Sequence, residues 1–213
     1  IANQDTLYKK KYSADKIMSF LKGKPGTDVK LKLYRKSEDL IIDVDLKRGK
    51  VPLKSVESSY MLNDSIGYLK INRFSQTTFD EFELALKKLL SEGMHKMILD
   101  LRDNPGGYLH SAKQISNTFL SKDQIIVITK TNTGEQEKSV AKGDGIFQKG
   151  HIIILVNEQS ASASEIVAGA IQDNDRGWII GRRTFGKGLV QKQMPLGGGD
   201  AVRLTIAKYF TPS

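Results

Sequence analysis

The sequence of 213 residues contains no cysteine, which excludes disulfide bonds and cysteine-ligated metal sites. It has three histidines, His95, His110 and His151, and none lies in a motif that indicates a catalytic base. No apolar run approaches the roughly 18 residues of a membrane-spanning helix, and no phosphate-binding loop of the form G-x-x-x-x-G-K-[ST] is present. We therefore expect no metal, no cofactor and no integral membrane span.

The positive charge of the chain does not by itself indicate a nucleic-acid partner. The net charge is +9, and residues 1–54 hold 14 lysines and arginines against 7 aspartates and glutamates. These charges are scattered through an alternating pattern and are not gathered with stacking aromatic residues. We interpret them as a solvated basic face and expect no binding to nucleic acid.

The first 50 residues predict a small α+β unit. Ser13–Leu21 is typical of a short helix, with Ser13 as the N-cap and Ile17 and Leu21 on its apolar face. A glycine-containing turn follows, and Val29–Tyr34 and Leu40–Leu46 then predict two strands. We expect one domain over residues 1–50 and a second over 51–213.

From residue 51 onward, strands and helices alternate, which indicates an α/β fold. The predicted helices are Thr78–Leu90, Leu109–Leu120 and Ser164–Gln172. The predicted strands are Ile66–Ile71, Met97–Leu101, Ile125–Thr129, His151–Val156, Trp178–Ile180, Leu189–Met194 and Val202–Phe210.

One serine-rich motif and one lysine between glycines suggest acyl-transfer chemistry. The chain reads Ser-Ala-Ser-Ala-Ser-Glu over residues 160–165, and Lys187 of Thr-Phe-Gly-Lys-Gly follows Ser162 by 25 residues. Such chemistry needs a hydroxyl nucleophile and a base, and a lysine kept neutral by burial can serve where histidine is absent. The pattern therefore favours a Ser–Lys hydrolase over a Ser–His–Asp one.

Three ordered blocks resemble one enzyme family. Residues 157–191 read NEQSASASEIVAGAIQDNDRGWIIGRRTFGKGLVQ, residues 99–107 read LDLRDNPGG, and residues 204–213 read LTIAKYFTPS. Together they resemble the carboxy-terminal processing proteases, also called tail-specific proteases, of peptidase family S41. The resemblance implies a crotonase-like or Clp-protease-like spiral of ββα units. It also implies that residues 1–50 are the C-terminal part of a PDZ domain.

The resemblance assigns roles to residues of the motifs. It implies Ser162 as nucleophile, Lys187 as general base and Gln191 as the third member of a Ser–Lys–Gln triad. The oxyanion hole is implied to use the N–H groups of Ala163 and of Gly107, which we favour over Gly106.

Each of these residues also has a structural interpretation. Ser162-x-x-Glu165 is a capping-box pattern, so Ser162 read locally is an N-cap. Lys187 and Gln191 would be ordinary surface residues, and Asn-Pro-Gly-Gly is an ordinary turn. We expect Phe185 to help shield Lys187 from water.

Two further expectations concern residues next to these motifs. Arg182 and Arg183 stand where the family commonly has an acidic residue, and we expect their charge to favour a neutral Lys187 or an acidic group nearby. We expect Asp100 and Arg102 to pair with each other rather than take part in chemistry.

The resemblance implies a serine endopeptidase that cuts proteins near their C-terminus through an acyl-enzyme. Its partners would be proteins or peptides with apolar C-terminal tails, and a homo-oligomer stays open. Because cysteine is absent, the chain fits a cytosolic or a bacterial envelope protein, and the resemblance favours the envelope or periplasm, with a signal or anchor outside this sequence. The alternatives are a non-catalytic peptide-binding homologue and a crotonase-type acyl-CoA enzyme, which would need an acid/base carboxylate instead of Ser162 and Lys187.

Overall fold

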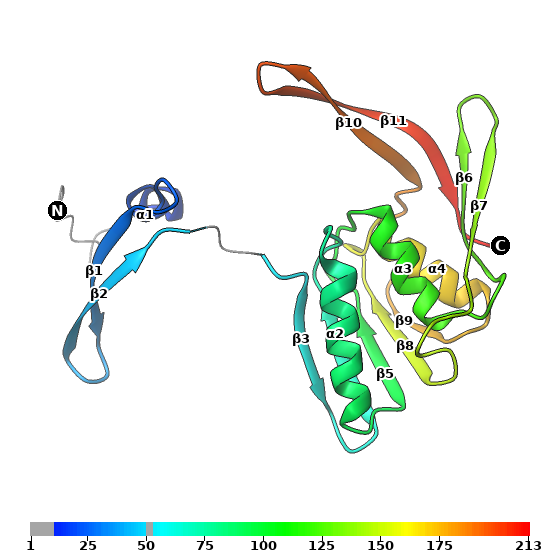
Figure 1. The fold of residues 1–213 in the computed structure, drawn as a ribbon, viewed down its shortest axis with the longest axis horizontal. Coiled ribbons are helices and arrows are strands. Elements are labelled where there is room, and N and C mark those ends of the chain that lie inside the picture. Colours follow the sequence, from blue (N-terminus) through cyan, green and yellow to red (C-terminus); the bar gives the residue numbers. More distant parts are fainter. Residues whose placement is uncertain (1–10, 50–52) are drawn as a thin grey trace. The chain divides into compact units, whose positions relative to one another are not determined.

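The computed structural model describes residues 11–49 and 53–213. Contacts divide the chain into two units, residues 1–53 and residues 54–213, which are coloured blue and cyan to red in Figure 1. The domain boundary expected at residues 50 and 51 lies outside the described residues and stays a prediction. Among the helices of the described ranges, none is both long and apolar enough to cross a membrane.

The first unit contains one helix and one hairpin. Helix α1 (Ala14–Leu21) begins after Ser13, whose hydroxyl accepts the N–H of Lys16 at 3.3 Å, as expected of an N-cap. Strands β1 (Asp28–Arg35) and β2 (Leu40–Lys47) pair antiparallel. The predicted helix and strands are thus confirmed. No side chain of residues 11–49 is fully buried.

The second unit is built on a five-stranded sheet of order β3-β4-β5-β8-β9. Its strands are β3 (Val56–Met61), β4 (Ile66–Ile71), β5 (Lys96–Asp100), β8 (His151–Val156) and β9 (Trp178–Gly181). β3 pairs antiparallel with β4, and the other neighbours are parallel. Because β5 and β8 are adjacent and parallel, the loops that follow them leave the sheet at the same edge.

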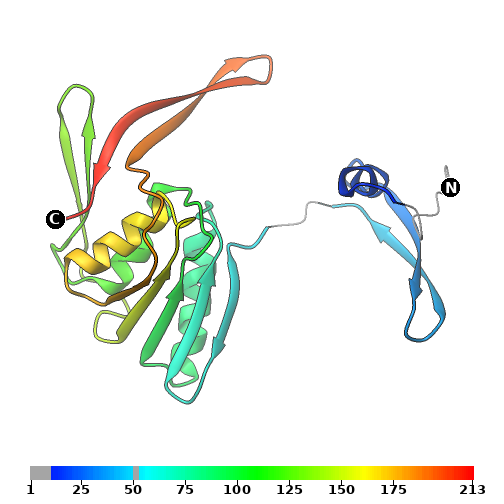
Figure 2. The ribbon, with the colours of Figure 1, turned by 180° about the vertical axis from the view of Figure 1, so that it is seen from behind.

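Helix α2 (Thr78–Ser91) runs along the strands and covers one face of the sheet in Figure 1, and in Figure 2 the strands lie in front of it. It buries Phe82, Leu86 and Leu89, the apolar face that its 3.6-residue period predicts. Helices α3 (Leu109–Phe119) and α4 (Ala163–Asp173) pack on each other and complete one continuous hydrophobic core.

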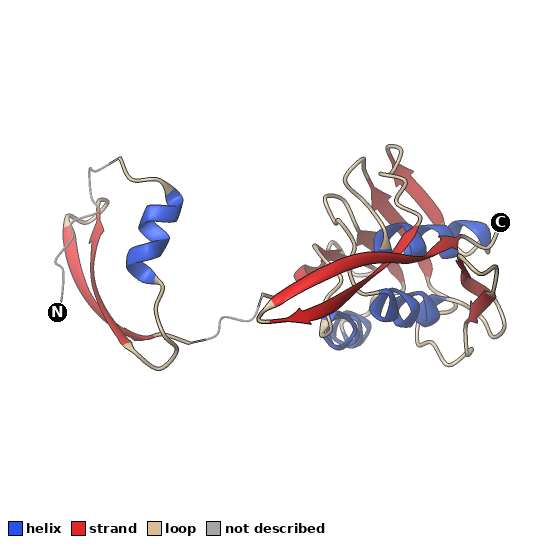
Figure 3. Cartoon of the chain, turned by 90° about the horizontal axis from the view of Figure 1, so that it is seen from above, coloured by secondary structure: helices blue, strands red, loops and turns tan. Residues whose placement is uncertain are grey.

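A second sheet has the order β10-β11-β6-β7. Its strands are β6 (Ile125–Thr131), β7 (Gln136–Val140), β10 (Leu189–Gly197) and β11 (Asp200–Phe210). β10 and β11 form a long hairpin that projects from the rest of this unit, as Figure 3 shows.

The α/β class and every helix and strand predicted from the sequence are confirmed, with ends shifted by up to three residues. β3 and β7 were not predicted. Residues 136–140 read QEKSV, a polar stretch that pairs only as the outer strand of a hairpin, so no apolar alternation marks it.

Candidate active site

Ser162 lies in the turn between β8 and α4, residues 157–162, which we call the serine turn. Of the three serines in this motif, Ser160 and Ser164 are fully buried. The Ser160 hydroxyl donates to the Leu101 carbonyl at 2.8 Å, and the Ser164 hydroxyl donates to the Asn104 carbonyl at 3.0 Å. Ser162 alone of the three is half-buried and lines a cavity of about 570 Å³. The flanking serines are therefore structural.

The backbone of Ser162 distinguishes it from an ordinary N-cap. Its φ is 57° and its ψ is −112°, whereas N-cap residues adopt the extended β region. A non-glycine residue with positive φ costs about 1–3 kcal/mol, and such strain clusters at functional sites. The capping-box interpretation accounts for Glu165, whose carboxylate accepts the Ser162 N–H at 2.7 Å. It does not account for the strained serine.

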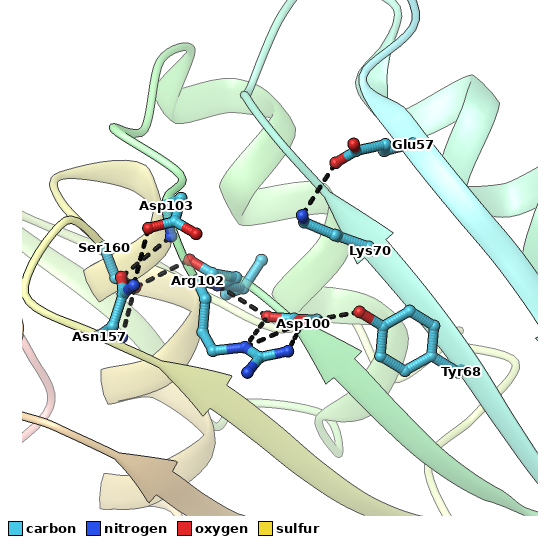
Figure 4. Close-up of polar contacts among 9 residues, drawn as sticks. Glu57, Tyr68, Lys70, Asp100, Arg102, Asp103, Asn157 and Ser160 are labelled. Atoms are coloured by element: carbon cyan, nitrogen blue, oxygen red, sulfur yellow. Dashed lines mark hydrogen bonds and ion pairs between the residues drawn. The ribbon is translucent and has the colours of Figure 1, made fainter.

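Hydrogen bonds made by the buried residues Asn104 and Asn157 join the loop after β5 to the serine turn. The Asn104 carbonyl accepts the N–H of Ala161 at 3.0 Å as well as the Ser164 hydroxyl. Farther along the same edge, Asn157 exchanges hydrogen bonds with Asp103, accepting its N–H at 2.9 Å and donating to its carboxylate at 2.8 Å (Figure 4). The loop after β5 and the serine turn are thus held together by hydrogen bonds at one edge of the sheet.

Asp100 is the last residue of β5, directly before this loop. Its buried carboxylate accepts hydrogen bonds from Arg102 at 2.6 Å and from the Tyr68 hydroxyl at 2.6 Å (Figure 4). Burial alone would raise the pKa of Asp100, but these hydrogen bonds outweigh burial and hold the pKa below its usual value. Burial and the same carboxylate raise the pKa of Tyr68 to about 12. The expected pairing of Asp100 with Arg102 is confirmed.

Two residues that line the cavity with Ser162 have backbone N–H groups that make no hydrogen bond to the described part of the chain. The Gly106 N–H donates to the Asn104 side chain at 2.9 Å. Within residues 53–213, the N–H groups of Gly107 and Ala163 make no hydrogen bond to the protein. Both residues line the same cavity as Ser162. This arrangement supports Gly107 over Gly106 as a donor to an oxyanion.

Lys187 lies in the loop before β10, is half-buried and also lines this cavity. Its ammonium group makes no hydrogen bond or ion pair with any described residue. The expected shielding by Phe185 is wrong, because that side chain is 68% exposed. Arg182 pairs with Glu158 at 2.7 Å, so an acidic group does lie beside it, and the expected effect of the two arginines on Lys187 stays a prediction.

Gln191 is the least engaged of the predicted residues. It lies on β10 and lines the cavity, but its side chain is exposed and makes no hydrogen bond to Lys187. A register irregularity between Val190 and Gln191 bends the strand at this point. The structure thus brings Ser162, Lys187, Gln191, Gly107 and Ala163 to one cavity without joining the first three by hydrogen bonds.

Two further residues hold this site together. The Glu165 carboxylate accepts backbone N–H groups from both the serine turn and the Lys187 loop. The Tyr209 hydroxyl lies within hydrogen-bonding reach of the carbonyls of Ser162 and Lys187, which share its one proton. The sequence indicated Glu165 only as a capping-box partner and Tyr209 only as part of the third block. The contact of Glu165 with the Lys187 loop and the contacts of Tyr209 join residues far apart in sequence.

The site resembles that of a hydrolase with an α/β fold. It combines a strained serine at a strand-to-helix turn with two N–H groups that no described residue accepts and with a lysine on the same cavity. Residues 65–213 match the family model of peptidase family S41, and the chain belongs to this family. The resemblance seen in the three sequence blocks is thereby confirmed.

Two curated relatives are similar over most of this chain. The carboxy-terminal-processing protease of Bartonella bacilliformis is 39% identical over 197 residues, covering 91% of this chain and 45% of that protein. The carboxyl-terminal-processing protease of Synechocystis is 36% identical over 205 residues, covering 94% of this chain and 47% of that protein. The chain thus spans less than half the length of these relatives.

Among solved structures, a photosystem II D1 C-terminal processing protease superposes with a TM-score of 0.66 at 28% identity, covering 89% of this chain and 52% of that one. A Bacteroides fragilis protein assigned to the S41 proteases gives a TM-score of 0.67 at 17% identity, covering 94% of this chain and 59% of that one, a likeness of fold.

Proposed function

We propose that this chain carries the catalytic unit of a serine endopeptidase. The observation that carries the proposal is that Ser162, alone among the three serines of its motif, reaches the cavity, in a strained backbone conformation and beside two unpaired N–H groups. Lys187 lines the same cavity and is the candidate base of the motif. Membership of family S41 supports the same assignment.

The proposed first step is acylation. The Ser162 hydroxyl oxygen forms a bond with the peptide carbonyl carbon, and its proton passes to the neutral amine of Lys187. The N–H groups of Gly107 and Ala163 donate to the oxyanion of the tetrahedral intermediate. The intermediate collapses by breaking the C–N bond, and the leaving amine takes the proton from Lys187.

Deacylation follows the same path with water. Lys187 takes a proton from the water that attacks the acyl carbon, and returns it to Ser162 as the ester bond breaks. Gln191 is proposed to orient the Lys187 amine, supported by its place on β10 at the same cavity. A neutral amide suits this role because a carboxylate there would favour the protonated amine.

The proposed substrates are proteins with apolar C-terminal tails. The names of the two relatives support processing at the C-terminus, and the apolar character of the tail is what the family resemblance implies. The first unit is proposed to be part of a PDZ domain, in which Ile17 and Leu21 of α1 form one wall of a peptide groove. Its hairpin leaves Leu33, Ile41 and Leu46 exposed. Further strands of a PDZ domain would cover such residues. A bacterial envelope or periplasmic location is proposed from the same bacterial relatives.

The test is acylation of the intact protein by an activated peptide nitrophenyl ester, read by nitrophenolate release and by mass spectrometry of the labelled peptide. Ser162→Ala should remove labelling and reduce cleavage by about 10⁴-fold, as for other covalent nucleophiles. Ser91→Ala, an exposed serine at the end of α2, is the control. Full activity of Ser162→Ala would refute the assignment, and an unlabelled wild type would favour the non-catalytic homologue. Comparing a peptide that ends in a free carboxylate with its amide tests tail recognition.

A further inference from the structure

The loop that carries Lys187 is held to the serine turn at consecutive residues. The N–H of Phe185 donates to the Ser160 carbonyl at 3.0 Å. The N–H groups of Gly186 and Lys187 donate to the two carboxylate oxygens of Glu165, at 2.6 and 2.9 Å. The Gly188 carbonyl accepts the N–H of Tyr209 at 3.0 Å. Such a density of bonds fixes the backbone of residues 185–188.

Glu165 joins the two reacting residues through a single oxygen. Its Oε2 accepts the N–H of Ser162 at 2.7 Å and the N–H of Lys187 at 2.9 Å. The carboxylate makes no ion pair with the Lys187 ammonium group, so it acts on Lys187 through the backbone. Hydrogen bonds to a charged acceptor are about twice as strong as neutral ones.

Tyr209 contacts the same two residues, Ser162 and Lys187, through their backbone carbonyls. Its one hydroxyl proton is shared between the Ser162 carbonyl, at 3.1 Å, and the Lys187 carbonyl. The tyrosine is 8% exposed and comes from β11, whereas Glu165 comes from α4. Burial, and then the charge of Glu165, raises the pKa of Tyr209, so the hydroxyl keeps its proton and stays a donor at neutral pH.

We propose that Glu165 and Tyr209 are positioning residues that together set the distance between the Ser162 and Lys187 backbones, and thereby the rate of acylation. Glu165 accepts hydrogen bonds from the two N–H groups, and the Tyr209 hydroxyl contacts the two carbonyls. Neither side chain is assigned to the reacting atoms. This inference rests on the proposed roles of Ser162 and Lys187.

The proposal predicts an effect on the chemical step and not on substrate binding. A misplacement of about 1 Å between reacting groups can cost about 100-fold in rate. Glu165→Ala should therefore lower the acylation rate and kcat by about 10- to 100-fold while KM changes by less than about threefold. Tyr209→Phe keeps the ring in place and removes only the donor, so it should lower the acylation rate by about 10-fold.

The chain offers a matched control for Glu165→Ala. Glu81 in the first turn of α2 accepts the N–H groups of Ser55 and Val56 at 2.7 and 3.1 Å, away from the cavity. Like Glu165→Ala, Glu81→Ala removes a carboxylate that accepts two backbone N–H groups. It should lower the melting temperature while leaving the acylation rate unchanged. A structural role alone would make the two glutamate variants alike.

The experiment measures nitrophenolate release by the intact protein and its Glu165→Ala, Glu81→Ala and Tyr209→Phe variants, with melting temperatures alongside. Acylation slowed in Glu165→Ala and Tyr209→Phe but not in Glu81→Ala supports the proposal. Wild-type acylation in Glu165→Ala, or equal slowing in Glu81→Ala, overturns it. If Glu165→Ala does not fold, Tyr209→Phe decides by the same criterion. Failure of the wild type to acylate at Ser162 would instead refute the proposed function.

Discussion

Gly106→Ala tests how closely the two loops of the site are packed. Gly106 has a φ of 91°, and a Cβ added there would lie 2.5 Å from the Ala161 carbonyl oxygen and 2.8 Å from both the Ala163 nitrogen and the Ser162 Cβ. Two of these three atoms are backbone, which cannot rotate away. An alanine must therefore push the serine turn outward.

Two costs add at this position, and the chain allows them to be separated. The positive φ costs about 1 kcal/mol for alanine, and forcing a methyl group into a packed site costs about 1–3 kcal/mol more. Gly134 has the same φ of 91°, but nothing lies within 4 Å of an added Cβ. Gly134→Ala should thus cost about 1 kcal/mol and Gly106→Ala about 2–4 kcal/mol in the free energy of unfolding.

Calorimetry and the acylation assay check both parts of this prediction. A loss of 1 kcal/mol lowers the melting temperature of a unit of this size by about 2–4 °C, so the melting temperature should fall by about 4–16 °C in Gly106→Ala and by about 2–4 °C in Gly134→Ala. Gly106→Ala should also slow acylation of Ser162, while Gly134→Ala should not. Equal melting temperatures for the two variants would refute the close packing of the loops.

Two further predictions concern charged residues. Lys187→Arg should reduce acylation as severely as Lys187→Ala, because a guanidinium stays protonated and cannot accept the Ser162 proton; near-normal acylation would show that the base lies elsewhere. The pKa of Asp100 is held below its usual value, so its stabilisation is present above the unfolded pKa of about 3.9 and is lost as pH falls through the folded pKa. Asp100→Asn should lower stability by about 2 kcal/mol at pH 7 and flatten the fall in melting temperature between pH 5 and 2; parallel curves for the two proteins would contradict the linkage.

The elements that position the site could be predicted from the sequence because their signals are local. β4 and β8 were predicted with their observed ends, since β8 is a short apolar run and β4 (IGYLKI) is a largely apolar segment between Ser65 and Asn72. Helix α4 follows from the spacing of Ile166, Val167 and Ala170. Ser162 could be proposed from its motif, although locally the motif is equally that of a helix cap.

The surroundings of Lys187 could not be predicted in the same way. Its neighbours come from α4 and β11, so its environment depends on tertiary packing and not on the Phe-Gly-Lys-Gly motif. The exposure of Phe185 is an example, because an aromatic residue beside glycines gives no sign of which way its ring turns. For the same reason Glu165 and Tyr209 carried no signal of their shared contacts.

The position of Tyr209 along the chain sets an order in which the site can form during synthesis. Its hydroxyl binds the carbonyl of Ser162, a residue 47 positions earlier. All five strands of the sheet that supports Ser162 precede Tyr209 in the sequence. As the chain leaves the ribosome, the serine turn and the Lys187 loop therefore exist before the residue that joins them. The catalytic geometry is completed only after β11 has been made.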